Sequence, residues 1–450
     1  MRHLPTPAAL ASALALAFVA PAAAQERIET DLALATFDSV WSRVHRSHYD
    51  TAFNGVDWVA VRDELRPRAA SAGTDPALRL VIGEMLGRLG DSHYTVIPGE
   101  VADAVDPEVL RAGGDAGVER TGDLGLGFRL LGDEMVVSDI DSAGPAFHAG
   151  IRAGWILESV DDRELAGAIA RVRGLEESRQ RRNGLTQLAF AANGLQEGAP
   201  GSPVVLGMRD GVDREVTVTV ERRRRLGEAT RFGNLPAFFA RLDHVRLTQG
   251  DGCIGVIRMN VWMVPLMAPF DRAVDELRDC DGIVVDLRGN PGGVAGMVAG
   301  VGGHFLTERI ALGHMRTRGV ALDIRANPRT VMPDGRRVEP IAGPLAILVD
   351  ELSVSTSEFF AGGMQAIGRA RVFGRTTAGQ ALPAAMARLP NGDVLLFVVA
   401  DFTAARDVRI EGVGVRPDVE VPLRRSDLLA GRDAVLNAAL RWVRDAENPD

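Results

Sequence analysis

Three short segments combine residue types that suit nucleophilic attack on a carbonyl carbon. The first is the serine-rich turn 350–360, in which Ser355 follows a buried apolar run and precedes a predicted helix. At a helix N-terminus, backbone N–H groups and the helix dipole stabilise an anionic intermediate. Ser355 is therefore a candidate nucleophile, although serine and threonine ahead of Glu358 are also typical of a plain helix cap.

The second segment is the glycine-rich loop Asp286–Gly293, which follows a buried strand and opens another helix. Glycines let backbone N–H groups approach a substrate carbonyl, as an oxyanion hole requires. The spacing fits neither a phosphate-binding loop nor a dinucleotide fingerprint. A purely structural turn is the alternative interpretation.

The third segment is the compact polar turn Leu89–Thr95, which holds one of the eight histidines, His93. A single histidine is usually structural, and no histidine spacing in the chain predicts a zinc site. All 51 basic residues are arginine, so the chain has no lysine. Any mechanism that needs a lysine amine is therefore excluded.

Length and composition indicate a globular protein with several domains. A chain of 450 residues is too long for one ordinary core, which favours two or three domains. Hydrophobic residues make up 46% and charged residues 25%, as in globular proteins. The net charge of -9 argues against a nucleic-acid partner, because phosphate backbones select basic surfaces.

The first residues predict an export signal. The apolar run Ala8–Val19 is too short to span a bilayer and is followed by three small residues, 22–24, before Gln25. We interpret residues 1–24 as a cleaved signal peptide rather than an uncleaved anchor. The protein is then expected in a periplasm or outside the cell, with no transmembrane anchor after cleavage.

The pattern along the chain changes twice. Apolar residues at helical spacing predict an N-terminal helical region over residues 25–100. Short strand patterns and a hairpin around Asp210-Gly211 predict a small module over 118–222. Strands alternate with helices after about residue 252, which predicts crossover units and a largely parallel sheet in the domain 223–450. The expected fold class is therefore α/β.

The two cysteines stand just before two apolar runs, Cys253 before 254–259 and Cys280 before 283–287. If those runs are neighbouring parallel strands, both thiols lie at the same edge of the sheet. Export permits a disulfide there. The sequence leaves a disulfide and two inert thiols as alternatives.

Several motifs together resemble one peptidase family. In chain order, the segments that carry the resemblance are Leu89–Thr95, Asp286–Gly293, Ser355–Phe360, Gly374–Gly379 and Gly412–Asp418. They resemble the ordered motifs of the C-terminal processing peptidases, or tail-specific proteases, and of their tricorn-like relatives. The resemblance implies a crotonase/ClpP-like mixed αβ catalytic core with an N-terminal helical region and an inserted PDZ domain.

The module over 118–222 looks like that PDZ domain. Its segment Gly125-Leu126-Gly127-Phe128 is similar to the loop that binds a peptide carboxylate. Such a loop captures the C-terminus of a protein tail, while the adjacent sheet edge takes the peptide as an added strand. The alternative is a PDZ domain that only packs against its neighbours.

The main departure from the family lies at Gln380. Members with a Ser/Lys dyad carry the lysine twenty-five residues past the serine, which is this position. Either the protein is inactive or another base serves Ser355. The tricorn-like relatives have a site that resembles a Ser-His-Ser-Glu tetrad, which Ser92, His93, Ser355 and Glu411 match here.

The resemblance implies a role for each residue of that set. His93 takes the proton of Ser355, because an imidazole titrates near neutrality. Glu411 orients the imidazole directly or through Ser92, and Asp91 is the alternative acid. The oxyanion hole is assigned to the backbone N–H group of Thr356 together with that of Gly292 or Gly293.

The sequence therefore predicts an exported serine endopeptidase that acts on protein or peptide substrates recruited by their C-terminal tails. It predicts no metal or other cofactor and no nucleic-acid partner. One alternative is a catalytically inactive PDZ-containing scaffold or ligand-binding protein of the same fold. Another is a hydrolase for a non-protein ester or amide.

Overall fold

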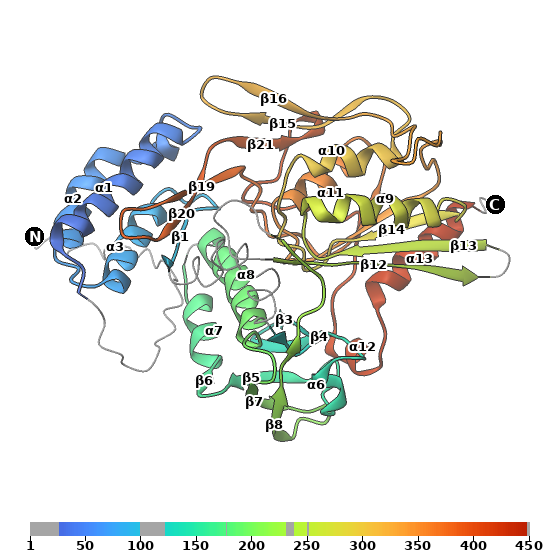
Figure 1. The fold of residues 1–450 in the computed structure, drawn as a ribbon, viewed down its shortest axis with the longest axis horizontal. Coiled ribbons are helices and arrows are strands. Elements are labelled where there is room, and N and C mark those ends of the chain that lie inside the picture. Colours follow the sequence, from blue (N-terminus) through green and yellow to red (C-terminus); the bar gives the residue numbers. More distant parts are fainter. Residues whose placement is uncertain (1–26, 100–121, 177, 231–237, 250–251, 448–450) are drawn as a thin grey trace, which may run out of the picture. The chain divides into compact units, whose positions relative to one another are not determined.

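The computed structural model describes residues 27–99, 122–176, 178–230, 238–249 and 252–447 (Figure 1). They fall into two compact units. Unit 1 is the N-terminal part together with Thr317–Val320 and Ala384–Ala400, and unit 2 is the remainder. The predicted signal peptide 1–24 lies outside the described residues.

Three helices form the core of unit 1 and confirm the predicted helical region. They are α1 (Thr30–Ser47), α2 (Trp58–Ala70) and α3 (Asp75–Gly87), with the short 3-10 helix η1 (Phe53–Gly55) between the first two. Asp57 and Thr74 cap α2 and α3, because their side chains accept hydrogen bonds from the first turn. The apolar faces meet at the fully buried Phe37, Leu65 and Ile82.

Segments from far along the chain complete unit 1. The strands β1 (Thr95–Ile97), β20 (Val394–Val398) and β19 (Ala384–Arg388) form an antiparallel sheet in that order. The turn between β19 and β20 contains Asn391-Gly392, a pair that favours tight turns. Leu395 joins the helical core, and the Arg79 guanidinium binds the buried Asp393 carboxylate at 2.7 Å. The helical region therefore does not bury its apolar face alone.

A six-stranded sheet forms the centre of unit 2. Its strands, in spatial order, are β12 (Leu242–Gln249), β13 (Gly252–Met259), β14 (Gly282–Asp286), β17 (Leu345–Val349), β18 (Arg371–Gly374) and β23 (Val419–Glu420). All neighbours from β13 onward are parallel, and β12 is antiparallel. The predicted alternation of strands and helices is confirmed. Every residue of β14 and β17 is buried, as in a sheet covered on both faces.

Helices cover the two faces of this sheet (Figure 1). One face packs against α9 (Met267–Glu276), α10 (Met297–Gly302) and α11 (Thr356–Ala366), and the other packs against α13 (Ala434–Glu447). Helix α10 has six residues. Its end is the 3-10 turn η4 (Gly303–Phe305), in a stretch rich in glycine, which weakens helices.

A second sheet of unit 2 has the order β16-β15-β21-β22. Its strands are β15 (Ile310–Arg316), β16 (Ala321–Ala326), β21 (Asp401–Ala404) and β22 (Val408–Arg409). The remaining short elements outside the inserted module are β10 (Glu228–Thr230), β11 (Phe238–Ala240), η3 (Val264–Leu266), η5 (Ala405–Asp407) and α12 (Arg425–Leu429).

The inserted module of unit 2 is a sheet with the order β3-β4-β5-β7-β8 and a short strand beside β5. The strands of this sheet are β3 (Leu126–Leu131), β4 (Glu134–Ile140), β5 (Ile156–Val160), β6 (Arg163–Glu164), β7 (Pro203–Arg209) and β8 (Glu215–Glu221). The strands β2 (Gly122–Asp123) and β9 (Arg223–Arg224) pair with each other beside it in the chain. The helices of the module are α6 (Pro145–His148), α7 (Ala166–Arg173) and α8 (Ser178–Leu195). The predicted hairpin around Asp210-Gly211 is confirmed, whereas α7 and α8 were not predicted.

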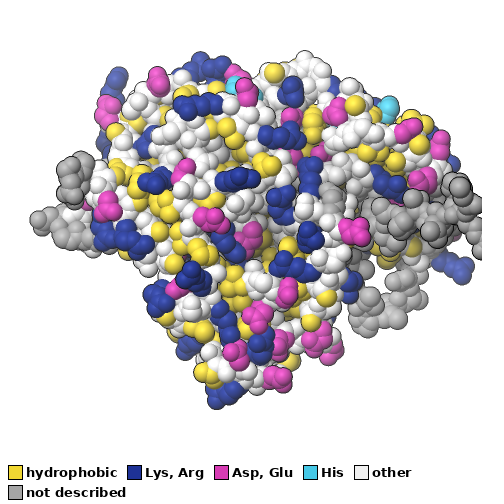
Figure 2. All heavy atoms as spheres, turned by 180° about the vertical axis from the view of Figure 1, so that it is seen from behind, with side chains coloured by type: hydrophobic (Ala, Val, Ile, Leu, Met, Phe, Trp, Pro, Cys, Tyr) yellow, Lys and Arg dark blue, Asp and Glu magenta, His cyan; other side chains and the backbone are white. Residues whose placement is uncertain are grey.

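On the face seen in Figure 2, arginine and acidic side chains are interspersed rather than gathered into one basic patch.

No helix in the described part of the chain combines the length and the apolar character needed to cross a bilayer.

Cys253 and Cys280 form a disulfide, with 4.8 Å between their Cα atoms. The predicted arrangement is confirmed, because β13 and β14 are parallel neighbours and Ile254 lies opposite Gly282. The bond joins the start of β13 to the turn before β14 across 27 positions of the chain.

We expect the double substitution Cys253→Ala and Cys280→Ala to lower the free energy of unfolding by about 3 kcal/mol, because the unfolded chain gains the freedom of the opened loop. Urea unfolding followed by circular dichroism measures the difference. Wild-type protein treated with dithiothreitol is the matched control and should unfold like the variant. Equal stability of the oxidised wild type and the variant would contradict this expectation.

Candidate active site

Ser355 lies in a strained turn between β17 and α11. Its φ of 57° and ψ of -116° belong to a region that non-glycine residues rarely adopt, and such a conformation costs about 1–3 kcal/mol. The backbone N–H of Ser355 donates to Gln380 O at 3.0 Å and to the Glu358 carboxylate at 3.1 Å. These two bonds hold the serine at the first turn of the helix, where sequence analysis placed it.

The glycine-rich loop lies directly against this turn. A Cβ at Gly292, where φ is 91°, would come within 2.7 Å of Ser355 Cβ and 2.9 Å of Thr356 N. Thr356 Oγ1 donates to Gly293 O at 2.9 Å, which fixes the second glycine as well. The N–H of Gly292 donates to Asn290 Oδ1 at 2.9 Å. Among the predicted oxyanion donors, the geometry therefore favours the N–H groups of Gly293 and Thr356 over that of Gly292.

Asn290 holds the loop in place, a role that sequence analysis missed. The residue is fully buried. Its Nδ2 donates to Met259 O at 2.9 Å, and its own carbonyl oxygen accepts from Val354 N at 3.0 Å and from Ser357 Oγ at 3.1 Å. Through its side-chain amide and its backbone carbonyl together, this residue connects the ends of β13 and β14 to the start of α11. In the sequence, this role is signalled only by an asparagine within a glycine-rich loop, a pattern that indicates a turn but no specific contact.

Glu358 is buried without exposed surface and accepts four hydrogen bonds. Its Oε1 accepts from Thr377 Oγ1 at 2.5 Å and Gly379 N at 2.8 Å, and its Oε2 accepts from Gln380 N at 3.0 Å and from Ser355 N. These bonds favour the ionised form, but burial outweighs them and raises the pKa of Glu358 to about 7. The carboxyl therefore connects the serine turn to the segment 377–380.

The backbone of Gln380 lies next to Ser355. Its carbonyl oxygen accepts from Ser355 N, and its side-chain Nε2 donates to Asn183 Oδ1 of α8 at 3.2 Å. An amide nitrogen has no basic lone pair, so this side chain is no substitute for a lysine.

Glu411 is buried rather than exposed, and its carboxylate has two partners. Arg179 on α8 approaches Oε1 at 2.5 Å, and Ala381 N donates to Oε2 at 2.7 Å. Arg182, one turn along α8, donates to the carbonyl oxygen of Gly412. The unpredicted helix of the inserted module thus supplies the cation that pairs with the predicted acid.

The Ser92-His93 turn belongs to unit 1. Ser92 is buried, and its Oγ lies 2.8 Å from His93 Nδ1. Burial lowers the pKa of His93 to about 4, so its imidazole is neutral at pH 7. The carboxylate of Asp91, the alternative acid, accepts from His48 Nε2 at 3.0 Å and from Asn54 Nδ2 at 2.9 Å.

The predicted tail-binding segment lies at the start of β3, and side chains of the same module already bond its edge. Gln196 accepts from Leu126 N at 3.1 Å and donates to Leu126 O at 2.6 Å. Asn193 of α8 accepts from Phe128 N at 2.9 Å and donates to Phe128 O at 3.1 Å. A peptide that adds to this edge must therefore displace two side-chain amides.

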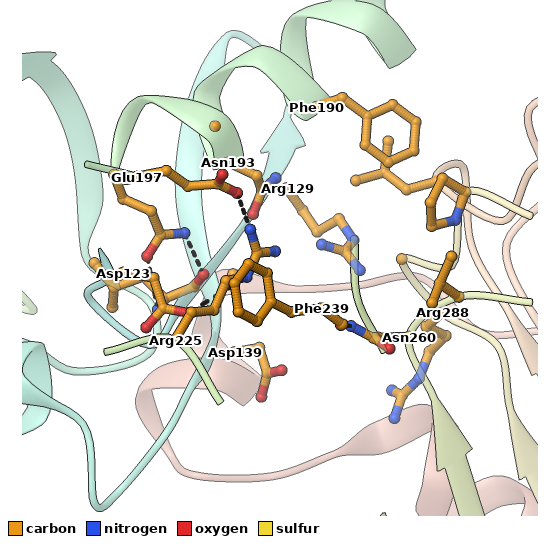
Figure 3. Close-up of a pocket in the computed structure, with 18 of the residues that line it drawn as sticks. Asp123, Arg129, Asp139, Phe190, Asn193, Glu197, Arg225, Phe239, Asn260 and Arg288 are labelled. Carbon is orange, nitrogen blue, oxygen red and sulfur yellow. Dashed lines mark hydrogen bonds and ion pairs between the residues drawn. The ribbon is translucent and has the colours of Figure 1, made fainter. Parts of the chain in front are cut away.

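A cavity of about 430 Å³ separates β3 and α8 from the glycine-rich loop (Figure 3). Its walls include Gly127, Phe190 and Pro291. Arg129 projects from β3 and binds Asp350 Oδ2 at 2.6 Å, and Asp350 Oδ1 accepts from Gly289 N at 2.9 Å. The predicted tail-binding strand and the glycine-rich loop therefore share one cavity and one chain of polar contacts.

Comparisons with known proteins point to one family. Residues 253–421 match peptidase family S41, and residues 34–87 match the tricorn protease C1 domain. Carboxyl-terminal-processing peptidase 2 of Arabidopsis thaliana is 26% identical over 86% of this chain and 68% of its own length. The carboxyl-terminal-processing protease of a Picosynechococcus strain is 25% identical over 88% and 83% of the two chains.

Tricorn-type proteins are also similar to this chain. Tricorn protease homolog 1 of Streptomyces coelicolor is 28% identical over 88% of this chain, which spans 34% of that relative. Among solved structures, the photosystem II D1 C-terminal processing protease matches with a TM-score of 0.56 and 22% identity, over 90% and 98% of the two chains. Mature CPAF matches with a TM-score of 0.57 and 14% identity, over 94% and 98%. These structures share the fold.

Glu358→Gln is expected to change how stability depends on pH. The carboxyl has a pKa of about 7 in the folded protein against an ordinary value of 4.5, so the folded state holds the proton more tightly. The resulting stabilisation is complete below pH 4.5 and is lost as the pH rises to about 7, a change of about 3 kcal/mol. The glutamine variant has no such proton, so the stability difference, wild type minus variant, should fall over this range.

Urea unfolding at several pH values on both sides of this range measures the difference. Glu221→Gln, which changes an exposed carboxyl on β8, is the matched control and should follow the wild type. Parallel pH curves for the wild type and the Glu358→Gln variant would contradict the assignment.

Proposed function

We propose that this chain, which matches peptidase family S41 over residues 253–421 and is similar to carboxyl-terminal-processing proteases, is an exported serine endopeptidase with Ser355 as nucleophile and His93 as general base. The observation that carries the proposal is the strained serine turn at the start of α11, packed against a glycine pair with positive φ. A merely structural cap needs neither feature.

In the proposed reaction, Ser355 Oγ attacks the carbonyl carbon of a peptide bond, and its proton passes to the Nε2 of His93. The N–H groups of Gly293 and Thr356 stabilise the oxyanion. The imidazolium then donates the proton to the leaving amine, and an acyl-enzyme remains. A water molecule, deprotonated by the same imidazole, releases the acyl group and restores the serine.

Burial keeps the His93 ring neutral at pH 7, with a lone pair that can accept a proton. Because burial also disfavours the imidazolium, the role of base requires a carboxylate that stabilises the charged ring. Ser92 Oγ lies beside Nδ1, so Nδ1–H can donate to it and leave Nε2 as the acceptor. We propose Glu411 as the acid that orients the ring, directly or through Ser92. Its burial supports a specific role, and its pairing with Arg179 compensates the buried charge.

Substrate recruitment is proposed to use the inserted module as a PDZ domain. The segment Gly125–Phe128 would receive the tail carboxylate, and the tail would extend along β3 into the cavity beside the glycine-rich loop. Export of the protein is proposed from the signal-like residues 1–24.

One observation favours a second function. Gln380 occupies the place of the family lysine, and its amide bonds α8 instead of serving Ser355 as a base. A protein of this fold without catalysis would remain a tail-binding scaffold. The presence of Ser355, His93 and the glycine pair favours the peptidase.

Ser355→Ala and His93→Ala are each expected to reduce cleavage of an unfolded, tail-tagged protein by at least about 10³-fold, because the nucleophile and base act as a unit. A fluorophosphonate should label the wild type at Ser355, and both variants should lose this labelling. Ser426→Ala, an exposed serine on α12, is the control.

Activity that survives both substitutions would refute the peptidase mechanism. Tail binding without labelling would identify the scaffold. Turnover of esters, with no cleavage of any peptide in a broad array, would indicate the non-protein hydrolase.

Asn193→Ala combined with Gln196→Ala is expected to strengthen tail binding by about tenfold, because the peptide no longer displaces two amide side chains. Fluorescence anisotropy with a peptide that ends in a free carboxylate measures the affinity. Gln187→Ala, an exposed amide elsewhere on α8, is the matched control. Unchanged affinity in the double variant would place the tail elsewhere.

A further inference from the structure

In unit 1, the buried side chains of His48 and Asp91 form a polar pair next to the Ser92-His93 turn. His48, the residue that ends α1, is fully buried, and its Nε2 lies 3.0 Å from Asp91 Oδ2. The Asp91 side chain is 1% exposed. Polar groups are rarely buried this deeply without a specific partner, because losing water is unfavourable. Asp91 stands two positions before the proposed base in the sequence.

The direction of this hydrogen bond follows from chemistry. A carboxylate only accepts, so the His48 ring must carry its proton on Nε2 and donate it to Asp91. The opposite ring nitrogen, Nδ1, lies 2.9 Å from Asp50 O and 3.1 Å from Asp50 N. Aromatic rings enclose the imidazole, with ring centroids 4.8 Å away for Tyr49, 5.4 Å for Phe53 and 6.2 Å for Tyr94. His48 is therefore a donor fixed in one orientation.

Asn54 forms a second attachment to the same turn. Its Nδ2 donates both to Asp91 Oδ2 and to Leu89 O, each at 2.9 Å. Its own backbone N–H donates to the Asp50 carboxylate at 2.8 Å, which fixes the loop that carries it. Two side chains from one loop thus hold the carboxylate of Asp91, and one of them also holds the backbone two residues earlier.

The turn needs such support because its backbone is strained. Gly90 has a φ of 70° and His93 a φ of 61°, so a histidine adopts a conformation that favours glycine. Strained residues persist only where the surroundings fix them. The orientation of the His93 ring follows from this backbone, since Ser92 Oγ, its partner at 2.8 Å, belongs to the same turn.

We propose that His48 and Asn54 are positioning residues for the catalytic turn, which they hold through the carboxylate of Asp91. This inference rests on the proposed role of His93 as the base. Asp91 then acts as the anchor of the turn rather than as the acid that orients the imidazole. The tip of the hairpin between β15 and β16 reinforces the arrangement, because Arg318 Nε donates to His48 O at 2.5 Å.

The experiment compares two substitutions of His48. His48→Leu removes the donor to Asp91, whereas His48→Gln supplies an amide N–H in its place. With fluorescein-labelled casein as the substrate, we expect His48→Leu to lower kcat by about 10–100-fold and to leave KM within about twofold, since binding is untouched. His48→Gln should stay within about threefold of the wild type. His45→Leu, one turn earlier on α1, is the matched control.

A spectroscopic measurement separates positioning from general loss of structure. In protein labelled with ¹⁵N-histidine, the ring signals of His93 should report one tautomer in the wild type and in His48→Gln. In His48→Leu they should show a mixture of tautomers or exchange broadening. If circular dichroism shows that His48→Leu does not fold, Asn54→Ala removes one donor from an exposed residue and should lower kcat by about 3–10-fold.

His93→Ala distinguishes the two possible failures. If fluorophosphonate still labels Ser355 in that variant, the proposed function fails. If His93→Ala abolishes labelling while folded His48→Leu and Asn54→Ala keep wild-type kcat and a single His93 tautomer, the proposed function stands and the positioning role is refuted.

Discussion

The close approach of Gly292 to Ser355 and Thr356 is the contact on which the nucleophile half of the site depends. It exists because β14 and β17 are parallel neighbours, so their carboxyl ends open into loops at the same edge of the sheet. Any side chain at Gly292 would collide with Ser355 Cβ. Asn290 fixes the glycine loop through its bond to the end of β13, and Glu358 fixes the serine turn by accepting from the backbone N–H of Ser355. The strain at Ser355 persists because both sides are held.

The parts of the fold that were predicted have local signals. Apolar periodicity predicted the helical N-terminal region, the alternation of strands and helices predicted the parallel sheet, and Asp210-Gly211 predicted a hairpin, because this pair favours a tight turn. The positions of the two cysteines before neighbouring strands predicted that both thiols lie at one edge of the sheet, whereas the sequence left a disulfide and two inert thiols as alternatives. The family assignment, now supported by matches over most of the chain, followed from the order of the motifs.

The parts that were not predicted depend on contacts between distant residues. The first half of helix α8 is rich in arginine and amide residues that contact Glu411 and Gln380, and only its second half, 185–195, carries apolar residues at helical spacing. Whether Glu411 is buried cannot be read from the sequence, because its partner lies 232 positions away. Glu358 looked like a cap residue, and only its burial reveals a carboxyl with a raised pKa.

The composition of unit 1 has a consequence for the order of events during synthesis. Its helices occupy the first hundred residues, but Leu395, Phe397 and Asp393, which complete their core, come near the end of the chain. A ribosome has made nearly the whole polypeptide before these partners exist. The segment that carries His93 must therefore wait, incompletely folded, until the rest has emerged.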